Sequence, residues 1–357
     1  MVYACSTVDT LPRAAPSTRV ASPTKGAIEC MNIRITGLAH RLGSTVIDAE
    51  TLENYFQREP GTVESLSGVT RLHRISKDED LVTLARDATL DALKEAGVAL
   101  ESVNGIFSSC NPTTDYLIPS LAPMVAAKLG LTHVLACNVA MGCAGGVQAL
   151  QAAYNQLLAD TARGRVRTYV LVTGDHISRM LDKEAWKTAI LFSDGISAVV
   201  LTNDPNATKG FLIESVNSEC YAGESVDVIN LPNALATRDS EEPKVCCLQM
   251  RGRGVFEFGT RIAPRVRELS GVASFEDFYI IPHQANIRML NELVPAFEVS
   301  AEQLYIDGIT KIGNISGAAC FLGLEDLMKG KVSSDARRIM LCAFGAELQV
   351  AVAVLSR

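Results

Sequence analysis

One plan of secondary structure occurs twice along this chain, and it restricts the possible folds more than any other feature. In each copy a turn of small residues leads into a helix, and two apolar strands joined by a glycine-containing turn follow. The first turn surrounds Cys143 and the second surrounds Asn314. Strands that are apolar throughout are buried on both faces between helices. The sequence therefore predicts a duplicated α/β protein, with its site where the two halves meet.

Predicted strands and helices alternate along most of the chain. A strand is expected from Met31 to Leu38, and the periodicity of residues 81–96 with a glycine at 97 predicts an amphipathic helix. Further strands are expected at 105–110, 134–140, 168–174, 197–202, 279–282, 338–344 and 348–355. Further helices are expected at 120–129, from about 145 to 159, at 286–294 and up to 329. The order of these elements predicts a buried sheet between helical layers.

The sequence divides into three predicted segments. Residues 1–30 are rich in Ala, Ser, Thr and Pro without periodicity, so we expect a disordered extension, with a transit-like segment or a start ahead of Met31 as alternatives. Residues 31–204 form the predicted N-terminal half, which carries the cysteine. Residues 205–357 form the predicted C-terminal half, which carries a histidine and an asparagine.

Composition excludes several classes of function. The net charge is −7, from 33 basic and 40 acidic residues without a basic block, so no nucleic acid partner is expected. No run of 18 apolar residues occurs, so no membrane span is predicted. Because 48% of residues are hydrophobic and 20% charged, we expect a large subunit interface, as in a homodimer, with a heteromeric pair as the alternative. Ten cysteines without a C-x-x-C pair predict no zinc site and fit a reducing cytoplasm.

Cys143 is the candidate nucleophile. It stands between a predicted strand and a predicted helix, in Gly142-Cys143-Ala144-Gly145-Gly146. Small neighbours let a carbonyl group approach the sulfur, and the partial positive charge at a helix N-terminus lowers a thiol pKa and can stabilise an oxyanion. The alternative interpretation is a small cysteine packed in a tight turn.

Two polar residues in the second half complete a possible site. His283 follows a buried strand in Pro282-His283-Gln284-Ala285-Asn286, where a histidine can be fixed in place or can be an ordinary capping residue. Asn314 lies in Gly313-Asn314-Ile315-Ser316-Gly317 ahead of a helix, where asparagine is often only a cap. Taken singly, neither residue identifies a site.

Together these three motifs resemble the ketoacyl-ACP synthase III branch of the thiolase-fold condensing enzymes, over about residues 32–357. The resemblance implies a duplicated five-layered αβαβα fold with two mixed sheets. It implies that Cys143 accepts an acyl group from a thioester, and that His283 and Asn314 hold the carbonyl of a malonyl-type thioester. The backbone N–H groups of Cys143 and Ala346 would form the oxyanion hole. No cofactor is implied, since coenzyme A or phosphopantetheine thioesters, on acyl-CoA or an acyl carrier protein, are the substrates.

Departures from the family pattern indicate a relative in secondary metabolism. Trp186, the only tryptophan, falls near an arginine of the family that flanks adenine, so it provides a stacking face or is merely an apolar surface residue. Arg288 matches a position that binds coenzyme phosphates or a carrier protein. Ile118 matches the residue that limits the acyl tunnel across the dimer, and a smaller side chain there admits a longer chain. Glu347 places a carboxylate where the family has glycine.

Several functions remain open at the level of sequence. Decarboxylative condensation in polyketide, fatty-acid or related biosynthesis is favoured, because acyltransferases on this fold tend to replace the residue at Asn314. Transfer of the acyl group from Cys143 to an alcohol or amine is the alternative. A non-catalytic partner subunit is disfavoured by the presence of Cys143, and simple thioester hydrolysis is the least favoured. All the catalytic alternatives make the chain an acyltransferase-class enzyme or a close relative of one.

Overall fold

The computed structural model describes residues 32–140, 142–222, 228–233, 247–332 and 334–357. The predicted extension over residues 1–30, and Met31 at the start of the predicted first strand, lie outside these residues. The chain from Asn32 to Arg357 forms one compact unit. No helix within the described ranges is long and apolar enough to span a bilayer.

Nine strands form one mixed sheet, and their order records the duplication. From β4 to β1 the pairings run parallel (β4–β6), antiparallel (β6–β7) and antiparallel (β7–β1). From β11 to β8 they repeat as parallel (β11–β12), antiparallel (β12–β13) and antiparallel (β13–β8). In sheet order the strands are β11 (Phe278–Pro282), β12 (Arg338–Gly345), β13 (Gln349–Ser356), β8 (Phe211–Cys220), β1 (Arg34–Leu42), β7 (Gly195–Thr202), β6 (Thr168–Asp175), β4 (Val103–Ser109) and β5 (Leu135–Ala140).

The two halves of the sheet are joined at one point. Only Arg34 and Ile35 of β1 pair with β8, opposite Leu212 and Phe211. The expected two sheets are therefore continuous at this end through hydrogen bonds, because β1 and β8 are the matching edge strands of the two halves. Away from this pairing the halves separate, and helices fill the space between them.

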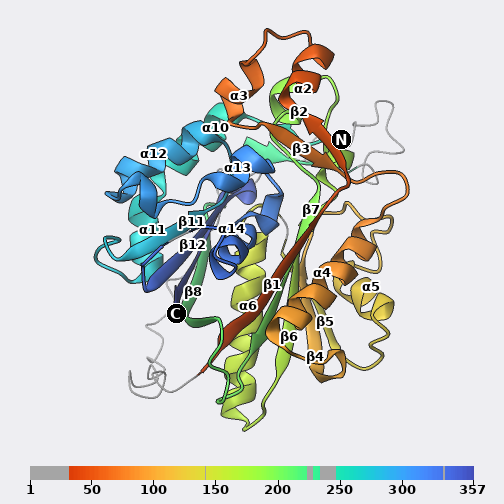
Figure 1. The fold of residues 1–357 in the computed structure, drawn as a ribbon, viewed down its shortest axis with the longest axis vertical. Helices are drawn as coiled ribbons and strands as arrows, with labels where there is room; N and C mark the ends of the chain where they lie inside the picture. Colours follow the sequence, from red (N-terminus) through yellow and green to blue (C-terminus); the bar gives the residue numbers. More distant parts are fainter. Residues whose placement is uncertain (1–31, 141, 223–227, 234–246, 333) are drawn as a thin grey trace, which may run out of the picture. The chain divides into compact units, whose positions relative to one another are not determined.

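Helices and sheet halves form five layers, as the thiolase fold requires. The helices α6 and α14 lie between the sheet halves in one core with Leu171 of β6 and Leu341 of β12. The helices α4 and α5 cover the outer face of the first half, and α11 and α12 cover that of the second (Figure 1). These helices are α4 (Leu81–Ala96), α5 (Leu121–Lys128), α6 (Gly145–Ala162), α11 (Ala263–Ser270), α12 (Ile287–Phe297) and α14 (Ala319–Met328).

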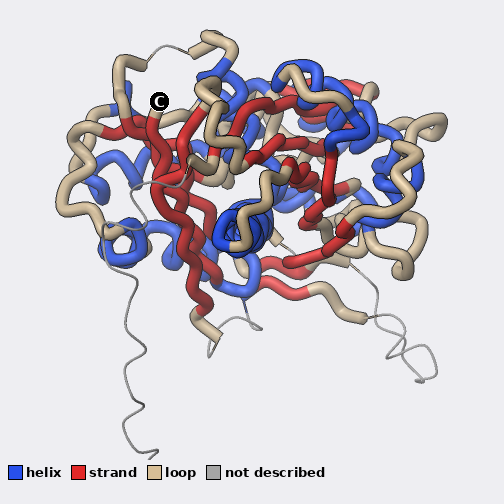
Figure 2. The backbone as a smooth tube through the Cα atoms, turned by 90° about the horizontal axis from the view of Figure 1, so that it is seen from below, coloured by secondary structure: helices blue, strands red, loops and turns tan. Residues whose placement is uncertain are grey.

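Neighbouring residues of a strand face different cores. In β12, Leu341 faces the central layer, whereas Met340 and Cys342 face α11 and α12. Figure 2 shows helices both outside the strands and between them. This burial on both faces is why the strands are apolar throughout rather than alternating.

The helix predicted at residues 81–96 agrees with the structure at both ends. Asp80 caps the N-terminus of α4 by accepting a hydrogen bond from the Thr83 N–H, at 2.8 Å. Gly97 ends the helix in the left-handed conformation, with φ of 71°. The other predicted helices and strands agree to within a few residues.

Several elements of the structure were not predicted from the sequence. Among them is β8, whose ten residues pair with β13 of the C-terminal half and with β1 of the N-terminal half. The others are α2 (Ala49–Tyr55), α3 (Thr62–Ser67), α7 (Trp186–Ala189), α10 (Gly252–Arg261), α11, α13 (Asp307–Lys311), β2 (Thr45–Asp48), β3 (Arg71–Arg74), β9 (Ile229–Asn230), β10 (Gln249–Met250) and the short 3₁₀ turns η1 (Leu100–Ser102), η2 (Ile177–Met180), η3 (Ala301–Gln303), η4 (Ser316–Ala318) and η5 (Ala346–Leu348).

Candidate active site

Cys143 lies in the turn between β5 and α6, half-buried. The turn begins at Gly142, whose φ is 77° and whose N–H donates to the Asn111 Oδ1 at 3.2 Å. A methyl group added at Gly146 would lie 2.3 Å from the Gly317 carbonyl oxygen. The small residues after Cys143 therefore allow the turn before α14 to touch the turn before α6.

Ala346 and Gly345 bring a third turn to the same sulfur. The Ala346 N–H forms a hydrogen bond to Cys143, so the predicted oxyanion donor is present next to the nucleophile. A Cβ atom added at Gly345 would lie 2.7 Å from the Cys143 Cβ and 3.1 Å from its Sγ. The backbone of β12 can approach the cysteine because this position has no side chain.

Burial controls the ionisation of Cys143. It raises the pKa of the thiol to about 11, and the nearby Asp175 carboxylate also raises it. The Ala346 N–H and the Ser316 hydroxyl lower this pKa only in part. The expectation of a lowered pKa at the start of α6 was therefore wrong for the empty site, because desolvation outweighs the favourable amide groups.

His283 is fixed at the end of β11. Its N–H donates to the Cys342 carbonyl at 2.8 Å, and its ring packs edge-on against Phe344. The adjacent Gln284, fully buried, donates to the carbonyls of Pro282 and Tyr305 and so holds the turn. Burial lowers the pKa of His283 to about 4, so its imidazole is neutral at physiological pH.

Asn314 is held by backbone on one side and faces His283 on the other. Its N–H donates to the Leu191 carbonyl at 2.9 Å, and its carbonyl accepts from the Ser193 N–H at 2.8 Å. Its Oδ1 accepts from the Ser316 N–H at 2.9 Å, a contact within the turn. It caps neither following helix, because Ile315 and Ala318 are the N-cap residues of η4 and α14. Its Nδ2 lies 3.4 Å from the His283 Nε2.

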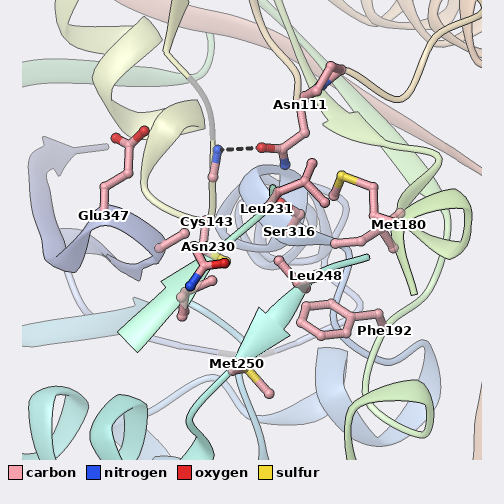
Figure 3. Close-up of a pocket in the computed structure, with 15 residues that line it drawn as sticks. Asn111, Cys143, Met180, Phe192, Asn230, Leu231, Leu248, Met250, Ser316 and Glu347 are labelled. Carbon is pink, nitrogen blue, oxygen red and sulfur yellow. Dashed lines mark hydrogen bonds between the residues drawn. The ribbon is translucent and has the colours of Figure 1, made fainter. Parts of the chain in front are cut away.

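Two cavities meet at Cys143. One, of about 230 Å³, is lined by Cys143, His283 and Asn314 together. The other, of about 260 Å³, is mostly apolar and is lined by Cys143, Ser316 and Glu347 among others (Figure 3). The three predicted catalytic residues therefore share one cavity, and a second cavity opens from the same sulfur.

The remaining predicted residues lie outside both cavity linings. The Arg58 guanidinium stacks over one face of Trp186 at 4.3 Å, so a ligand could use only the other face without displacing it. Arg288 is exposed on α12, and Ile118 is 88% exposed on the loop before α5. Their proposed roles stay predictions. Glu347, at the wall of the 260 Å³ cavity, pairs its carboxylate with the Gln349 Nε2.

Sequence reasoning did not assign a role to several residues that shape the site. Asp175 is a buried carboxylate that accepts hydrogen bonds from the N–H and Nδ2 of Asn111, at 2.7 and 2.9 Å. Ser193 ties the Asn314 turn to the first half through its N–H. The sequence marks these positions only by the motif Phe192-Ser193-Asp194-Gly195 and by Ser316, two residues after Asn314. Neither pattern indicates a function by itself.

Within the ranges that the structure describes, no three His, Cys, Asp or Glu side chains are grouped so that they could hold a metal ion.

Comparisons with known proteins find similar sequences in one family. A family model described as 3-oxoacyl-[acyl-carrier-protein (ACP)] synthase III matches residues 137–220, and one described as its C-terminal part matches residues 271–357. A beta-ketoacyl-[acyl-carrier-protein] synthase III from Clostridium perfringens is 26% identical over 329 residues, 91% of this chain and 99% of the relative.

Solved structures show the same fold. The 3-oxoacyl-(acyl carrier protein) synthase III of Pseudomonas aeruginosa is 26% identical with a TM-score of 0.78, covering 91% of this chain and 98% of that one. The priming beta-ketosynthase of a polyketide biosynthetic pathway has a TM-score of 0.81 at 22% identity, covering 96% and 99%, and supports the fold alone.

The fold is that of the thiolase-fold condensing enzymes, and three turns meet at one cysteine within it. Within that class, the chain is a ketoacyl-ACP synthase III-like protein.

Proposed function

We propose that this protein loads an acyl group from a thioester onto Cys143 and condenses it with a malonyl or β-ketoacyl-type thioester, with loss of CO₂ when a malonyl unit is used. The observation that carries the proposal is the single cavity shared by Cys143, His283 and Asn314. The reaction serves polyketide, fatty-acid or related secondary-metabolite biosynthesis. The acyl donor is acyl-CoA or an acyl carrier protein.

The chemistry follows from two neutral donors opposite a nucleophile. As the malonyl C–C bond breaks, CO₂ leaves and negative charge collects on the thioester oxygen. The Asn314 amide and the neutral His283 imidazole stabilise that charge without giving the carbanion a proton. The carbanion then attacks the acyl carbonyl on Cys143, a C–C bond forms and the Cys143 sulfur leaves. The N–H groups of Cys143 and Ala346 stabilise the oxyanion at this step.

A screen of acyl donors tests the loading step. We expect one acyl-CoA or acyl-carrier thioester to add the mass of its acyl group to the intact protein, and Cys143→Ala to abolish the gain. If no donor in a series from acetyl to long-chain adds mass to the wild type, the proposal is wrong.

A charge substitution tests the condensation step. Asn314→Asp keeps an oxygen acceptor for the Ser316 N–H but replaces the Nδ2 donor by a negative oxygen beside the developing enolate. We expect CO₂ release from a malonyl thioester to fall by about 10²–10³-fold, as for loss of an oxyanion donor, and loading of Cys143 to fall far less. Equal losses in both steps would contradict the assigned role. Acyl transfer to an amine or alcohol without CO₂ would instead favour plain acyl transfer.

A further inference from the structure

Ser316 combines two unusual features beside the nucleophile. Its φ is 54°, in the left-handed region that residues other than glycine seldom adopt. Its side chain is 1% exposed and lines the same cavity as Cys143 (Figure 3). A strained non-glycine backbone in a packed site is retained where the surrounding structure requires it, often where a side chain has a function.

The backbone of Ser316 makes two hydrogen bonds, of which its carbonyl accepts one from the Ala319 N–H. Its N–H donates to the Asn314 Oδ1 at 2.9 Å and turns the Asn314 Nδ2 toward His283. Any residue at position 316 can supply this N–H, and glycine would do so without strain. The backbone contact therefore does not explain why a side chain, and a hydroxyl in particular, is present.

The hydroxyl of Ser316 is available for chemistry. Among the residues that the structure describes, its buried Oγ has no partner at ordinary hydrogen-bond distance, although it faces Cys143 and Asp175. The turn η4, which begins with Ser316, packs against β6 and the start of α6. Strand β6 ends at Asp175, and α6 begins directly after the Cys143 turn. The Ser316 hydroxyl lies close enough to both side chains to lower the pKa of each. A buried hydroxyl without a partner is costly unless it is used.

Asp175 completes the arrangement. Its carboxylate is 3% exposed and is held from one side by the N–H and Nδ2 of Asn111. Within the described ranges no lysine, arginine or histidine forms an ion pair with it. Burial raises the pKa of this carboxyl, which makes it a better proton acceptor than an exposed aspartate. His283, with a pKa of about 4, is a weak base for the same thiol.

We propose that Ser316 is a catalytic residue of acyl loading, whose hydroxyl passes the proton of the Cys143 thiol to Asp175. This inference rests on the proposed function, because it assigns the base for the loading step.

Protons and bonds balance over the cycle. The Ser316 Oγ accepts the S–H proton and gives its own to an Asp175 oxygen, while the Cys143 sulfur forms a bond to the acyl carbon. The donor's C–S bond breaks, and its thiolate takes a proton from water. After condensation the Cys143 sulfur leaves as a thiolate and recovers the stored proton from Asp175 through Ser316. Asp175 thus holds the proton while the acyl-enzyme exists.

Two substitutions of Ser316 test the hydroxyl. Both Ser316→Ala and Ser316→Gly remove it and keep the N–H to Asn314, and glycine also relieves the backbone strain. With the acyl donor that loads the wild type, we expect both variants to load Cys143 at least about 10²-fold more slowly, as for loss of a general acid–base group. We expect CO₂ release from a malonyl thioester alone to fall far less than loading, because both variants keep the N–H that holds Asn314.

A matched control separates catalysis from packing. Thr36 on β1 also carries a buried hydroxyl without a partner among the described residues, and it lines neither cavity at Cys143. Thr36→Val should therefore load Cys143 at the wild-type rate. Loading of Ser316→Gly at the wild-type rate would overturn the proposal, since it would show that only the backbone matters.

Asp175→Asn gives a test in which the two interpretations predict opposite signs. If Asp175 acted only as a nearby charge, its removal would lower the pKa of Cys143 and speed loading. As a proton acceptor, its removal slows loading at neutral pH by at least about tenfold. Loading that is equal or faster refutes the relay. If Asp175→Asn does not fold, the loading rates of Ser316→Ala and Ser316→Gly still decide whether the hydroxyl takes part in loading. If no acyl donor loads the wild-type protein, the proposed function is refuted instead. The failure of the relay and the failure of the proposed function are therefore distinguishable.

Discussion

At the scale of single residues, the site balances two opposite effects on one sulfur. The start of α6 and the Ala346 N–H favour the thiolate of Cys143, whereas burial and the charge of Asp175 favour the thiol. Burial prevails, because desolvation of the thiolate is the largest influence on this pKa, ahead of the hydrogen bond from the Ala346 N–H. The enzyme therefore holds a thiol at neutral pH and needs a base at the moment of attack.

The pH dependence of alkylation tests this state of Cys143. Only the thiolate reacts with iodoacetamide, and the pKa of Cys143 is raised from 9.0 to about 11. Below that pKa the thiolate fraction increases with pH, so the rate should rise about tenfold per pH unit from pH 7 to 10 without levelling. The rate is read as mass added to the peptide that contains Cys143. A plateau below pH 8 would mean that the helix N-terminus governs the sulfur after all.

The sequence singled out residues whose local context is distinctive, and their catalytic roles stay predictions. Cys143, His283 and Asn314 each follow a buried strand or lie in a small-residue turn, and the structure brings all three to one cavity. Asp175 and Ser316 escaped assignment because their roles depend on contacts between halves that are distant in the sequence. The pKa of Cys143 was mispredicted because depth of burial is a property of the fold rather than of the turn.

At the scale of elements, the site depends on close contact between turns. The end of β12 touches the turn before α6 at Gly345, whose φ of 150° suits glycine. Gly345→Ala places a methyl group 2.7 Å from the Cys143 Cβ, so the cysteine or the Ala346 N–H must move. We expect loading to fall at least about 10²-fold, the effect of a displacement of about 1 Å in a catalytic group. Intact-mass kinetics measure it.

A second glycine provides the control for backbone strain. Gly97 at the end of α4 has φ of 71°, but a methyl group there would meet nothing within 4 Å. Gly97→Ala should cost about 1 kcal/mol of stability, measured by urea unfolding, and leave the loading rate unchanged. If both alanine variants lose loading alike, the contact of β12 with Cys143 is not what matters.

Elements with a strong periodic pattern were predictable, and those fixed by pairing were not. The helix α4 has three apolar positions in every two turns and both end signals, so its bounds agreed with prediction. The strand β8 carries polar residues such as Glu214 and Asn217 between its buried ones, and a bulge interrupts the alternation near Val354 of its partner β13. Its assignment depends on the neighbouring strands more than on its own sequence.

At the scale of the whole molecule, the two halves form one site because each holds a turn of the other. The N–H of Asn314, from the second half, donates to Leu191 of the first, and the N–H of Ser193 donates back to Asn314. The Ser193 hydroxyl adds a hydrogen bond to the Ile312 carbonyl. The duplication predicted this junction, but the exchange of hydrogen bonds between turns could be known only from the structure.

One edge of the molecule indicates a second copy of the chain. The strand β5 is the last of the sheet beyond β4, and its apolar residues Leu135 and Val139 are 42% and 36% exposed. The nearby loop before α5 exposes Tyr116 and Ile118 as well. An exposed apolar edge strand pairs with other strands unless something covers it. We therefore expect a homodimer in which β5 pairs with its symmetry mate.

A charge on this edge tests the dimer. Wild type should sediment at twice the chain mass of 38.3 kDa, and Val139→Lys should sediment as a monomer, because a buried lysine at the edge disfavours pairing. Val46→Lys, at the 55% exposed Val46 on β2, is the matched control and should remain a dimer. A monomeric wild type, or a dimeric Val139→Lys, contradicts the assignment of β5. Because β5 leads directly to Cys143, dissociation should also reduce loading, so that assembly and the geometry of the nucleophile are coupled.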